Sequence, residues 1–279
     1  MKKFRIIALM LALVMLLSLT ACSKKPVAKR YVALEIKDLP ASEYVICVSK
    51  AIPDGQEILA AINKAIADMD EEFIKMYRTG NVPNSGRARE LFEANNVLRE
   101  NEDDDPINVF TQVYNPFSYG GPYGAYIDGI DAVICSEAAV ALGRSVIFND
   151  RVMSFSYQQV KSGVGDVLIS AVAKSDELAK DFLLSDVYET GKQYMVCLNT
   201  TGVEKVKDLS NLTIGVISGR VGEKFINEQI TKGTITGATV IAFDTDTEAK
   251  TALYNQRIDV IVEDELPAKQ TVRELSKGR

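Results

Sequence analysis

Side chains that could perform acid–base chemistry are unevenly supplied in this sequence. Histidine, the commonest general base and a frequent metal ligand, does not occur in the 279 residues. Its absence disfavours serine–histidine triads and ordinary zinc-hydrolase sites. Three consecutive carboxylates, Glu263, Asp264 and Glu265, follow the apolar run "DVIV". Acids at the end of such a run commonly have structural roles, so we expect no enzyme activity.

Thiols and glycines do not form a recognised reactive motif either. Cys47, Cys135 and Cys197 lie in or beside apolar stretches without C-x-x-C spacing. This pattern favours buried thiols over a metal site. The alternative is that two of the three cysteines form a disulfide in an exported protein. "SGRVGEK" (218–224) lacks the Gly-Lys-Ser/Thr ending of a phosphate-binding loop. The acidic run 102–105 lacks the spaced ligands of a calcium loop, so we expect no metal and no cofactor.

The first residues predict export and a lipid anchor. Lys2, Lys3 and Arg5 precede an apolar run of 12 residues, shorter than the roughly 20 that a bilayer-spanning helix needs. "SLTAC" follows, which makes residues 1–21 a lipoprotein signal peptide. "LTAC" resembles the bacterial lipobox, which implies that acylated Cys22 becomes the new N-terminus. We therefore expect attachment to the outer face of the cell membrane, extracellular or periplasmic, through the polar tether 22–30.

The charge of the mature chain narrows its possible partners. Removing residues 1–21 leaves 258 residues, enough for two lobes, and takes the formal charge from −6 to −9. Nucleic-acid binding depends on positive charge, so we expect no nucleic-acid partner.

The hydrophobic pattern predicts an α/β protein with two lobes. Short β-branched runs at 213–217, 239–243 and 259–263 alternate with stretches of helical spacing. This alternation is typical of a mostly parallel sheet with helices on its faces. The same rhythm occurs between residues 108 and 172, and 192–200 is expected to cross between the lobes.

Three helices are predicted, two of them with the residues expected at their ends. Asp131 is expected to cap one helix, and Gly143 to end it. Asp54 and Glu57 form a capping pattern before a second, which has one apolar stripe and a structural role. The polar segment 79–106 reads as a linker with one exposed helix. The stripe consists of Ile58, Leu59, Ile62, Ile66, Met69, Phe73 and Tyr77.

Residues 108–268 resemble the family 3 extracellular solute-binding proteins, which deliver amino acids to ABC transporters. Six segments match the family in its usual order, although no single one is specific. They are "YNPFSY" (114–119), "GIDAVICSEAAVALGRSVIF" (129–148), "YQQVKSGVGDVLI" (157–169), "AKDFLLSDVYETGKQYMV" (179–196), "KDLSNLTIGVISGRVGEKFI" (207–226) and "ALYNQRIDVIVEDELPA" (252–268).

The resemblance implies a two-lobed, type II periplasmic-binding-protein-like fold that captures an amino acid or a related small amine-bearing solute by interlobe closure. The partners implied are that solute and an ABC transporter permease. The alternatives are a non-transporting sensor or a decayed paralogue. A dehydratase or peptidoglycan lyase on the same scaffold is a further alternative.

The order of the segments differs from that of the family. In the family, the chain continues after the last matching segment, returns to lobe 1 through a strand and ends in helices. Here the corresponding pieces lie at 31–77, before the other segments. We therefore predict a circular permutation; the alternative is a truncated remnant of a tandem pair that assembles by exchange. The predicted lobe 1 is 46–190, lobe 2 is 31–45 plus 191–279, and 79–106 bridges the old ends.

The family's site comprises an aromatic sandwich, an Arg for the solute carboxylate, Thr hydroxyls beside it, and an Asp for the ammonium. By position, Tyr114 and Phe117 supply the first aromatic wall, although a core role for one of them is the alternative. Met153 replaces the second wall with a softer, less selective side chain. The segment that meets the ammonium group carries Ser170, Ala171 and Val172, and then Ala173 in place of the usual Thr.

Two positions depart from the family at the carboxylate. Leu178 stands where the Arg is expected, and an aliphatic chain cannot replace its two parallel donors. Arg220 and Val221 stand at a helix start where the family has two Thr. Arg220 either restores the missing charge from the other lobe or lies on the surface. Asp264 stands at the family's ammonium-binding position. The alternative is that it caps a helix or is a surface carboxylate. An ordinary α-amino acid should then bind weakly unless Arg220 compensates; a cationic amine, a modified amino acid or a short peptide fits better.

Overall fold

The computed structural model describes residues 30–79, 86–101, 105–120 and 127–277. The predicted signal peptide, Cys22 and all of the tether except Arg30 lie outside this range. Residues 80–85 and 102–104 of the predicted bridge also lie outside it. Tyr31–Arg279 form one unit, which contains both sheets described below.

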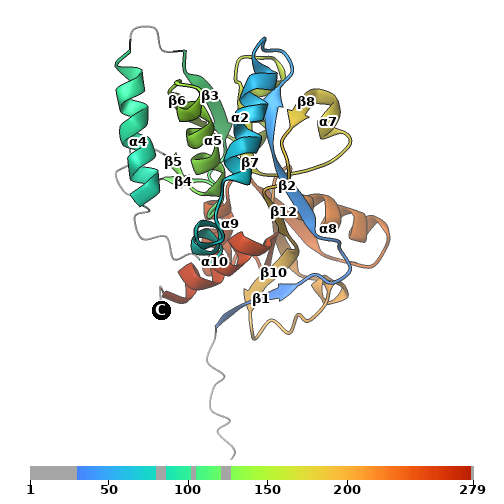
Figure 1. Cartoon of the computed structure of the whole chain (residues 1–279). Coiled ribbons are helices and arrows are strands. Elements are labelled where there is room, and N and C mark those ends of the chain that lie inside the picture. Colours follow the sequence, from blue (N-terminus) through green and yellow to red (C-terminus); the bar gives the residue numbers. More distant parts are fainter. Residues whose placement is uncertain (1–29, 80–85, 102–104, 121–126, 278–279) are drawn as a thin grey trace, which may run out of the picture. The chain divides into compact units, whose positions relative to one another are not determined.

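Lobe 1, as observed, is built on a six-stranded mixed sheet (Figure 1). Strand β3 pairs in parallel with β6 and β7, while β2 runs antiparallel to β7, β8 and β9. The strand order is β6 (Val146–Asp150), β3 (Ile107–Thr111), β7 (Val167–Ala173), β2 (Ser42–Ser49) and β8 (Phe182–Leu184), with β9 (Glu189–Gly191) also on β2.

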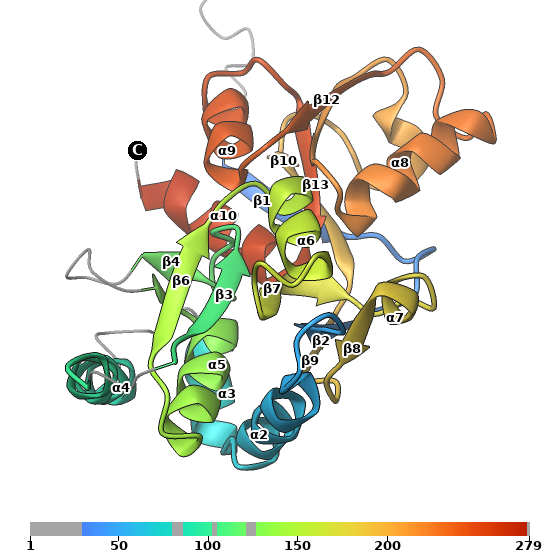
Figure 2. The ribbon, with the colours of Figure 1, turned by 90° about the horizontal axis from the view of Figure 1, so that it is seen from above.

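Both faces of this sheet are covered by helices because successive strand residues point to opposite sides. In β2, Ile46 and Val48 join one apolar cluster, whereas Val45 and Cys47 join another. Figure 2 shows α2 (Gly55–Ala67) and α5 (Ile130–Ala141) on one side of the sheet and α6 (Met153–Lys161) on the other. The short α7 (Leu178–Asp181) contributes Leu178 to the cluster on the α6 side.

Lobe 2 is built on a five-stranded sheet with the same layering. Strand β13 runs parallel to β11 and antiparallel to β10, which in turn pairs with β1. Helix α8 (Val221–Thr231) packs on one face, and α9 (Asp246–Tyr254) and α10 (Glu265–Lys277) pack on the other (Figure 2). The strand order is β1 (Tyr31–Glu35), β10 (Gln193–Leu198), β13 (Val260–Asp264), β11 (Thr213–Ile217) and β12 (Thr239–Phe243); a 3₁₀ turn, η1, spans Val206–Leu209.

The predicted lobe boundary at residue 45 is displaced by a few residues. Strand β2 begins at Ser42, and its first residues pair with β9 in the sheet of lobe 1. The chain therefore passes between the lobes at residues 36–41, and it passes back between β9 and β10, at Lys192. The partner strand β9 is distant in the sequence, so Ser42–Val45 carry no local signal that they belong to lobe 1. The sequence therefore placed the boundary between the lobes a few residues too late.

Two helix starts differ from their predicted form. The apolar stripe of the second predicted helix is divided between α2 and α3 (Glu71–Arg78), because the Asp70 carboxylate accepts the Phe73 N–H at 2.7 Å and starts a new helix. Asp54 occupies the N-cap of α2, but its side chain pairs with Arg144 instead of capping. Asp131 lies inside the first turn of α5 and does not cap it, since the N-cap is Gly129.

Two predictions, on Gly143 and on the buried cysteines, are confirmed by the structure. Gly143 follows the last residues of α5 with a φ of +70°, the conformation typical of a helix end. The cysteines Cys47, Cys135 and Cys197 are buried free thiols, so the disulfide alternative is not observed. No group of His, Cys, Asp or Glu that could hold a metal was found in the described residues. Within the same residues, no helix has the length and hydrophobicity of a membrane span.

The predicted linker helix is packed against lobe 1. Helix α4 (Gly86–Arg99) contacts α5 (Figure 1), and the Asn95 side chain accepts the Val146 N–H at 2.6 Å and donates to the Val146 carbonyl at 3.3 Å. Arg99 donates to the same carbonyl at 2.7 Å. These bonds satisfy backbone groups at the start of the edge strand β6, a common way to protect a sheet edge. Helix α4 therefore lies on lobe 1, within the predicted range 46–190, and most of its described side chains other than Asn95 are exposed or half-buried. A further short hairpin, β4 (Tyr119–Gly120) with β5 (Ile127–Asp128), completes the lobe.

Candidate binding site

A cleft of about 810 Å³ lies between the two lobes, and its walls come from both. Lobe 1 contributes α6, the end of β7 and α7. Lobe 2 contributes the first turns of α8 and the end of β13, and residues 39–43, from the crossover and the start of β2, close one side. The lining is largely apolar, with Met153, Val172, Leu178, Val221 and Phe225 among its side chains.

Asp264 lines this cleft, and the protein's own donors surround its carboxylate. The side chain is 3% exposed at the end of β13. Its Oδ1 accepts the Tyr44 hydroxyl at 2.6 Å and the Gln193 amide, and its Oδ2 accepts the Tyr114 hydroxyl at 2.8 Å. Tyr44 and Tyr114 belong to lobe 1, so this buried charge joins the lobes. Three donors offset the cost of removing the carboxylate from water.

The two tyrosines are held in their protonated form. Burial, assisted by the negative charge of Asp264, raises the pKa of Tyr44 and of Tyr114 far above the ordinary value. Both hydroxyls therefore act as hydrogen-bond donors at any physiological pH. The Tyr114 hydroxyl also accepts the Asp264 backbone N–H at 3.2 Å, which fixes the direction of its donated hydrogen.

Arg220, at the N-cap of α8, points into the cleft and not onto the surface. Its guanidinium carbon lies 3.6 Å from the centre of the Tyr114 ring. One terminal nitrogen donates to the Ser170 carbonyl at 2.8 Å, and the other donates to the Ser170 hydroxyl at 2.7 Å. The Nε atom is buried and has no hydrogen-bond partner in the described part of the chain. The two terminal nitrogens are thus engaged by lobe 1, across the cleft from α8.

An unusual backbone conformation aims Ser170 at Arg220. Ser170 and Ala171 have φ values of 110° and 50°, which residues with a Cβ rarely adopt. The buried Asp131 carboxylate accepts both of their N–H groups, at 2.7 and 3.0 Å, and so stabilises this turn. Burial raises the pKa of Asp131 to about 6, although these N–H groups and the Arg220 charge oppose the shift. Backbone strain of this kind is concentrated at functional sites.

The predicted site residues fall into three groups. Met153, Val172, Arg220 and Asp264 line the cleft, as do the departures Ala173, Leu178 and Val221. Tyr114 and Ser170 lie behind Arg220, which covers them. Phe117 is wholly buried and stacks behind Tyr114 with 6.2 Å between ring centres, so the structure places it in the core, the alternative weighed above.

Sequence reasoning missed Tyr44, Gln193 and the role of Asp131. Tyr44 lies 220 residues before Asp264, and Gln193 lies 71 residues before it, so no local motif connects them. The family segments cover Asp131 and Gln193, but they give no reason to prefer these residues to their neighbours. Gln193 offered one signal of a functional role, because it is a polar residue at the start of a buried strand.

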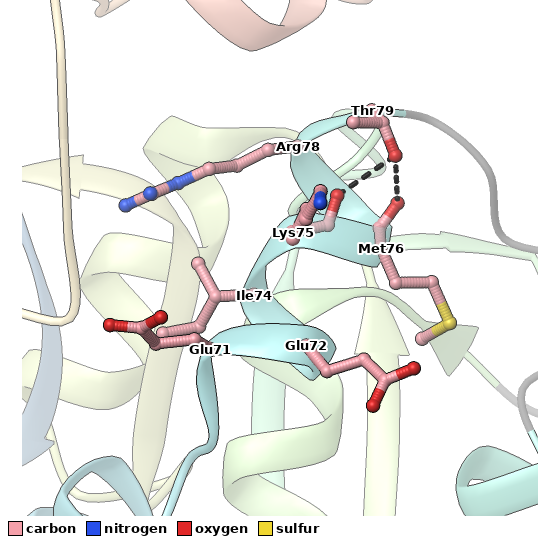
Figure 3. A pocket seen from close by; sticks show the side chains of 7 residues that line it. All are labelled: Glu71, Glu72, Ile74, Lys75, Met76, Arg78 and Thr79. Atoms are coloured by element: carbon pink, nitrogen blue, oxygen red, sulfur yellow. Dashed lines mark hydrogen bonds between the residues drawn. The ribbon is translucent and has the colours of Figure 1, made fainter.

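A larger hollow, about 1040 Å³, lies beside α3. Figure 3 shows that its labelled lining comes from this one helix and that the charged ends of Glu71, Glu72, Lys75 and Arg78 do not converge on one point. The Thr79 hydroxyl donates to carbonyls of the preceding turn. The guanidinium of Arg78 is engaged by both oxygens of Glu189. We place the candidate site in the interlobe cleft because side chains of different elements converge there.

Comparison with known proteins agrees with this geometry. The profile of the bacterial extracellular solute-binding proteins, family 3, matches residues 107–271, more than half of the chain. The chain belongs to this family. The two-sheet topology described above is the type II binding-protein fold of its structural neighbours.

Named relatives give the extent of the similarity. The arginine-binding extracellular protein ArtP of Bacillus subtilis (strain 168) is 29% identical over 111 residues, which cover 40% of this chain and 43% of ArtP. The match thus spans less than half of that relative. An ancestral arginine-binding protein bound to arginine is 26% identical, with a TM-score of 0.55 over 61% of this chain and 74% of that one. The ancestral protein bound to glutamine is 25% identical, with a TM-score of 0.54 over 61% and 73%.

Proposed function

We propose that this protein is an exported, lipid-anchored receptor that captures an amino acid or a related small amine-bearing solute and delivers it to the permease of an ABC importer. Membership of family 3 supports the receptor role. The similar proteins named above bind arginine or glutamine, which supports the solute class. The apolar run and the "LTAC" sequence before Cys22 support export and anchoring.

The interlobe cleft is the observation that carries the proposal. Side chains from α6, β7 and α7 face side chains from α8 and β13 across about 810 Å³, a size suited to a small solute. The chain crosses between the lobes at 36–41 and again at Lys192. Rotation of the backbone at these crossovers opens and closes the cleft by a hinge.

In the open cleft, Asp264 becomes available to a solute ammonium group. Tyr44 and Tyr114 move away with lobe 1, and the carboxylate then needs another donor. On the facing wall, Val172 lines the cleft, and the Ser170 carbonyl lies behind Arg220, which donates to it. Leu178, by contrast, offers no donor to a carboxylate. The site therefore favours an amine over an ordinary α-amino acid.

The proposal is tested by a thermal-shift screen of the purified protein against amino acids, polyamines and short peptides, followed by calorimetry on each hit. An amine-bearing solute that raises the melting temperature and binds one to one, and that Asp264→Asn weakens by at least tenfold, supports the proposal. A complete screen without a binding solute contradicts it.

One observation favours a second candidate, a sensor or decayed paralogue that does not transport. The Asp264 carboxylate already has three protein donors, and Arg220 already occupies the space over Tyr114. Such a protein remains closed and binds no solute. A screen in which no solute binds, together with association of the protein with a signalling partner in place of a permease, distinguishes this role. The enzyme alternative has less support, because the similar proteins are named as binding proteins.

The circular permutation also remains our proposal. Strand β1 packs against α10, and Tyr31 shares an apolar cluster with Val272 and Leu275 near the other end of the described chain. A short connection between these ends is all that the family's usual order needs. Chain ends that are close together are typical of proteins that tolerate permutation.

A further inference from the structure

The inner end of the cleft contains a cation that belongs to the protein itself. The Arg220 guanidinium lies over the Tyr114 ring, with its central carbon 3.6 Å from the ring centre. Its two terminal nitrogens donate to the carbonyl and hydroxyl of one residue, Ser170. The Ser170 hydroxyl in turn donates to the Gln112 carbonyl at 2.6 Å, so its free lone pair faces the guanidinium.

These contacts are those that a guanidinium group requires. The aromatic face attracts a planar cation, and the two oxygens of Ser170 match two N–H donors. The positive charge of Arg220 opposes the rise in the pKa of Asp131, Tyr44 and Tyr114, so the guanidinium lies close to all three groups. The turn at Ser170 is held by Asp131 and does not depend on Arg220 for its hydrogen bonds.

We propose that the inner half of the cleft is a binding subsite for a guanidinium group and that Arg220 of the same chain occupies it. The side chain acts as a tethered occupant, supplied from the start of α8 in lobe 2 to a site on lobe 1. This inference deepens the proposed function, because it rests on the cleft being the solute site. It follows that the native protein closes without a solute and that an external guanidinium group binds only after Arg220 is removed.

The direct test removes the tethered group and supplies a free one. Arg220→Ala is purified beside the wild type and beside Lys232→Ala, which removes one exposed positive charge just beyond the C-terminal end of α8, outside the cleft. Melting temperature and calorimetry are recorded with ethylguanidinium, with propylammonium as a cation of similar size, and with sodium chloride for ionic strength.

We expect the Arg220→Ala protein to melt below the wild type and ethylguanidinium to restore part of the loss. Its affinity for ethylguanidinium should exceed that of the wild type and of Lys232→Ala by at least tenfold. It should also exceed the affinity of Arg220→Ala for propylammonium. Equal response of the three proteins, or equal response of Arg220→Ala to both cations, overturns the inference.

A measurement on the wild type covers the case in which Arg220→Ala does not fold. Modification with phenylglyoxal, read by mass spectrometry, reports the access of a reagent to each arginine. We expect Arg220 to react at least tenfold more slowly than the exposed Arg257 in the folded protein. Equal rates at the two positions contradict an enclosed guanidinium.

The same proteins separate this inference from the proposed function. A panel solute that binds the wild type, with no ethylguanidinium effect in Arg220→Ala, supports the receptor role and rejects the tethered occupant. An ethylguanidinium effect without any panel solute supports the occupant and rejects the receptor role. Arginine that binds the wild type tightly and loses affinity in Arg220→Ala shows that Arg220 holds the solute, and this result also rejects the inference.

Discussion

Buried charge at Asp264 joins the two lobes through a few hydrogen bonds, and the most connected donor is Tyr114. In Tyr114→Phe the ring remains beneath Arg220, but Asp264 loses one of its three donors. We expect the unfolding free energy to fall by about 1–3 kcal/mol, the usual cost of leaving such a group unsatisfied. Urea unfolding measures the change. Tyr254→Phe, at a tyrosine that is 47% exposed on α9, is the control, and an equal loss in both variants contradicts the account.

Glu263, the neighbour of Asp264 in β13, gives a prediction about pH. Burial raises its pKa to about 8 from an ordinary 4.5, although the positive charge of Lys250 opposes the shift. Between these two values the folded protein retains a proton that the unfolded chain has lost. The contribution of Glu263 to stability is therefore full below about pH 4.5 and is lost as the pH rises through about 8. Asp246, Lys250, Asp264 and Thr271 are the groups that act on Glu263.

The variant Glu263→Gln cannot ionise, so its stability should depend less on pH. We expect it to exceed the wild type at pH 8 by on the order of 2 kcal/mol and to approach it at pH 5. Urea unfolding at pH 5, 6.5 and 8 provides the measurement, with Glu90→Gln on the exposed side of α4 as the control. Parallel pH curves for Glu263→Gln and the wild type would show that this carboxyl is not buried as described.

Alignment with the family, within and between its matching segments, was enough to predict that Asp264, Met153 and Leu178 lie at one cleft. It could not assign their partners. Tyr44 and Gln193 reach Asp264 across the fold, and their types and neighbours are those of ordinary buried strands. The sequence left open whether Arg220 points into the cleft or lies on the surface, because its direction depends on contacts with Ser170 and Tyr114 in the other lobe.

Among the helices and strands, the start of α5 is the most tightly constrained. Gly129 precedes it with a φ of +121°, and a Cβ there would lie 2.2 Å from the Phe117 carbonyl oxygen. Gly143, beyond the end of the same helix, has a φ of +70° and open space around it. We expect Gly129→Ala to lower the unfolding free energy by at least about 3 kcal/mol, and Gly143→Ala by about 1 kcal/mol.

Thermal and urea unfolding of the two glycine variants measure this difference. Both positions have a positive φ, but the φ of +121° and ψ of 170° at Gly129 are accessible almost only to glycine, so the comparison measures this backbone strain together with the close approach to Phe117. A loss of unfolding free energy in Gly129→Ala no larger than that in Gly143→Ala would mean that the loop before α5 adjusts freely. The close packing of Gly129 against the Phe117 backbone would then be contradicted.

Hydrophobic alternation predicted the strands and their order along the chain well. The runs "TIGVI" and "TVIAF" coincide with β11 and β12 to the residue. Helix starts were less predictable, because capping depends on competition for the same side chain. Asp54 pairs with Arg144, and Asp131 holds the turn at Ser170, so neither carboxylate is left for its own helix. The packing of α4 on β6 is likewise a tertiary contact that its polar sequence does not show.

For the chain as a whole, the proposed permutation predicts that the order of segments can be reversed without loss of the fold. A rearranged gene would run from residue 86 to 279, continue through a short Gly/Ser linker, and end with residues 30–79. We expect this protein to fold as a monomer with a melting temperature within about 10 °C of the original, because every sheet pairing is retained. Circular dichroism and gel filtration measure this.

A second rearrangement, opened between Ile46 and Cys47 inside β2, is the control and should not fold, because it cuts a strand that pairs with β7, β8 and β9. Failure of both rearranged proteins, or a domain-exchanged dimer of the native chain, would support the tandem-remnant alternative instead.

The central claim is that a solute is held between the lobes, and calorimetry on matched variants tests it most directly. Ala173→Trp fills the cleft from lobe 1, Val221→Trp fills it from lobe 2, and Lys75→Glu changes the hollow beside α3. With the best solute of the screen, we expect each Trp variant to weaken binding at least tenfold and Lys75→Glu to leave it unchanged. Binding that survives both Trp variants, or that only Lys75→Glu removes, would contradict the claim.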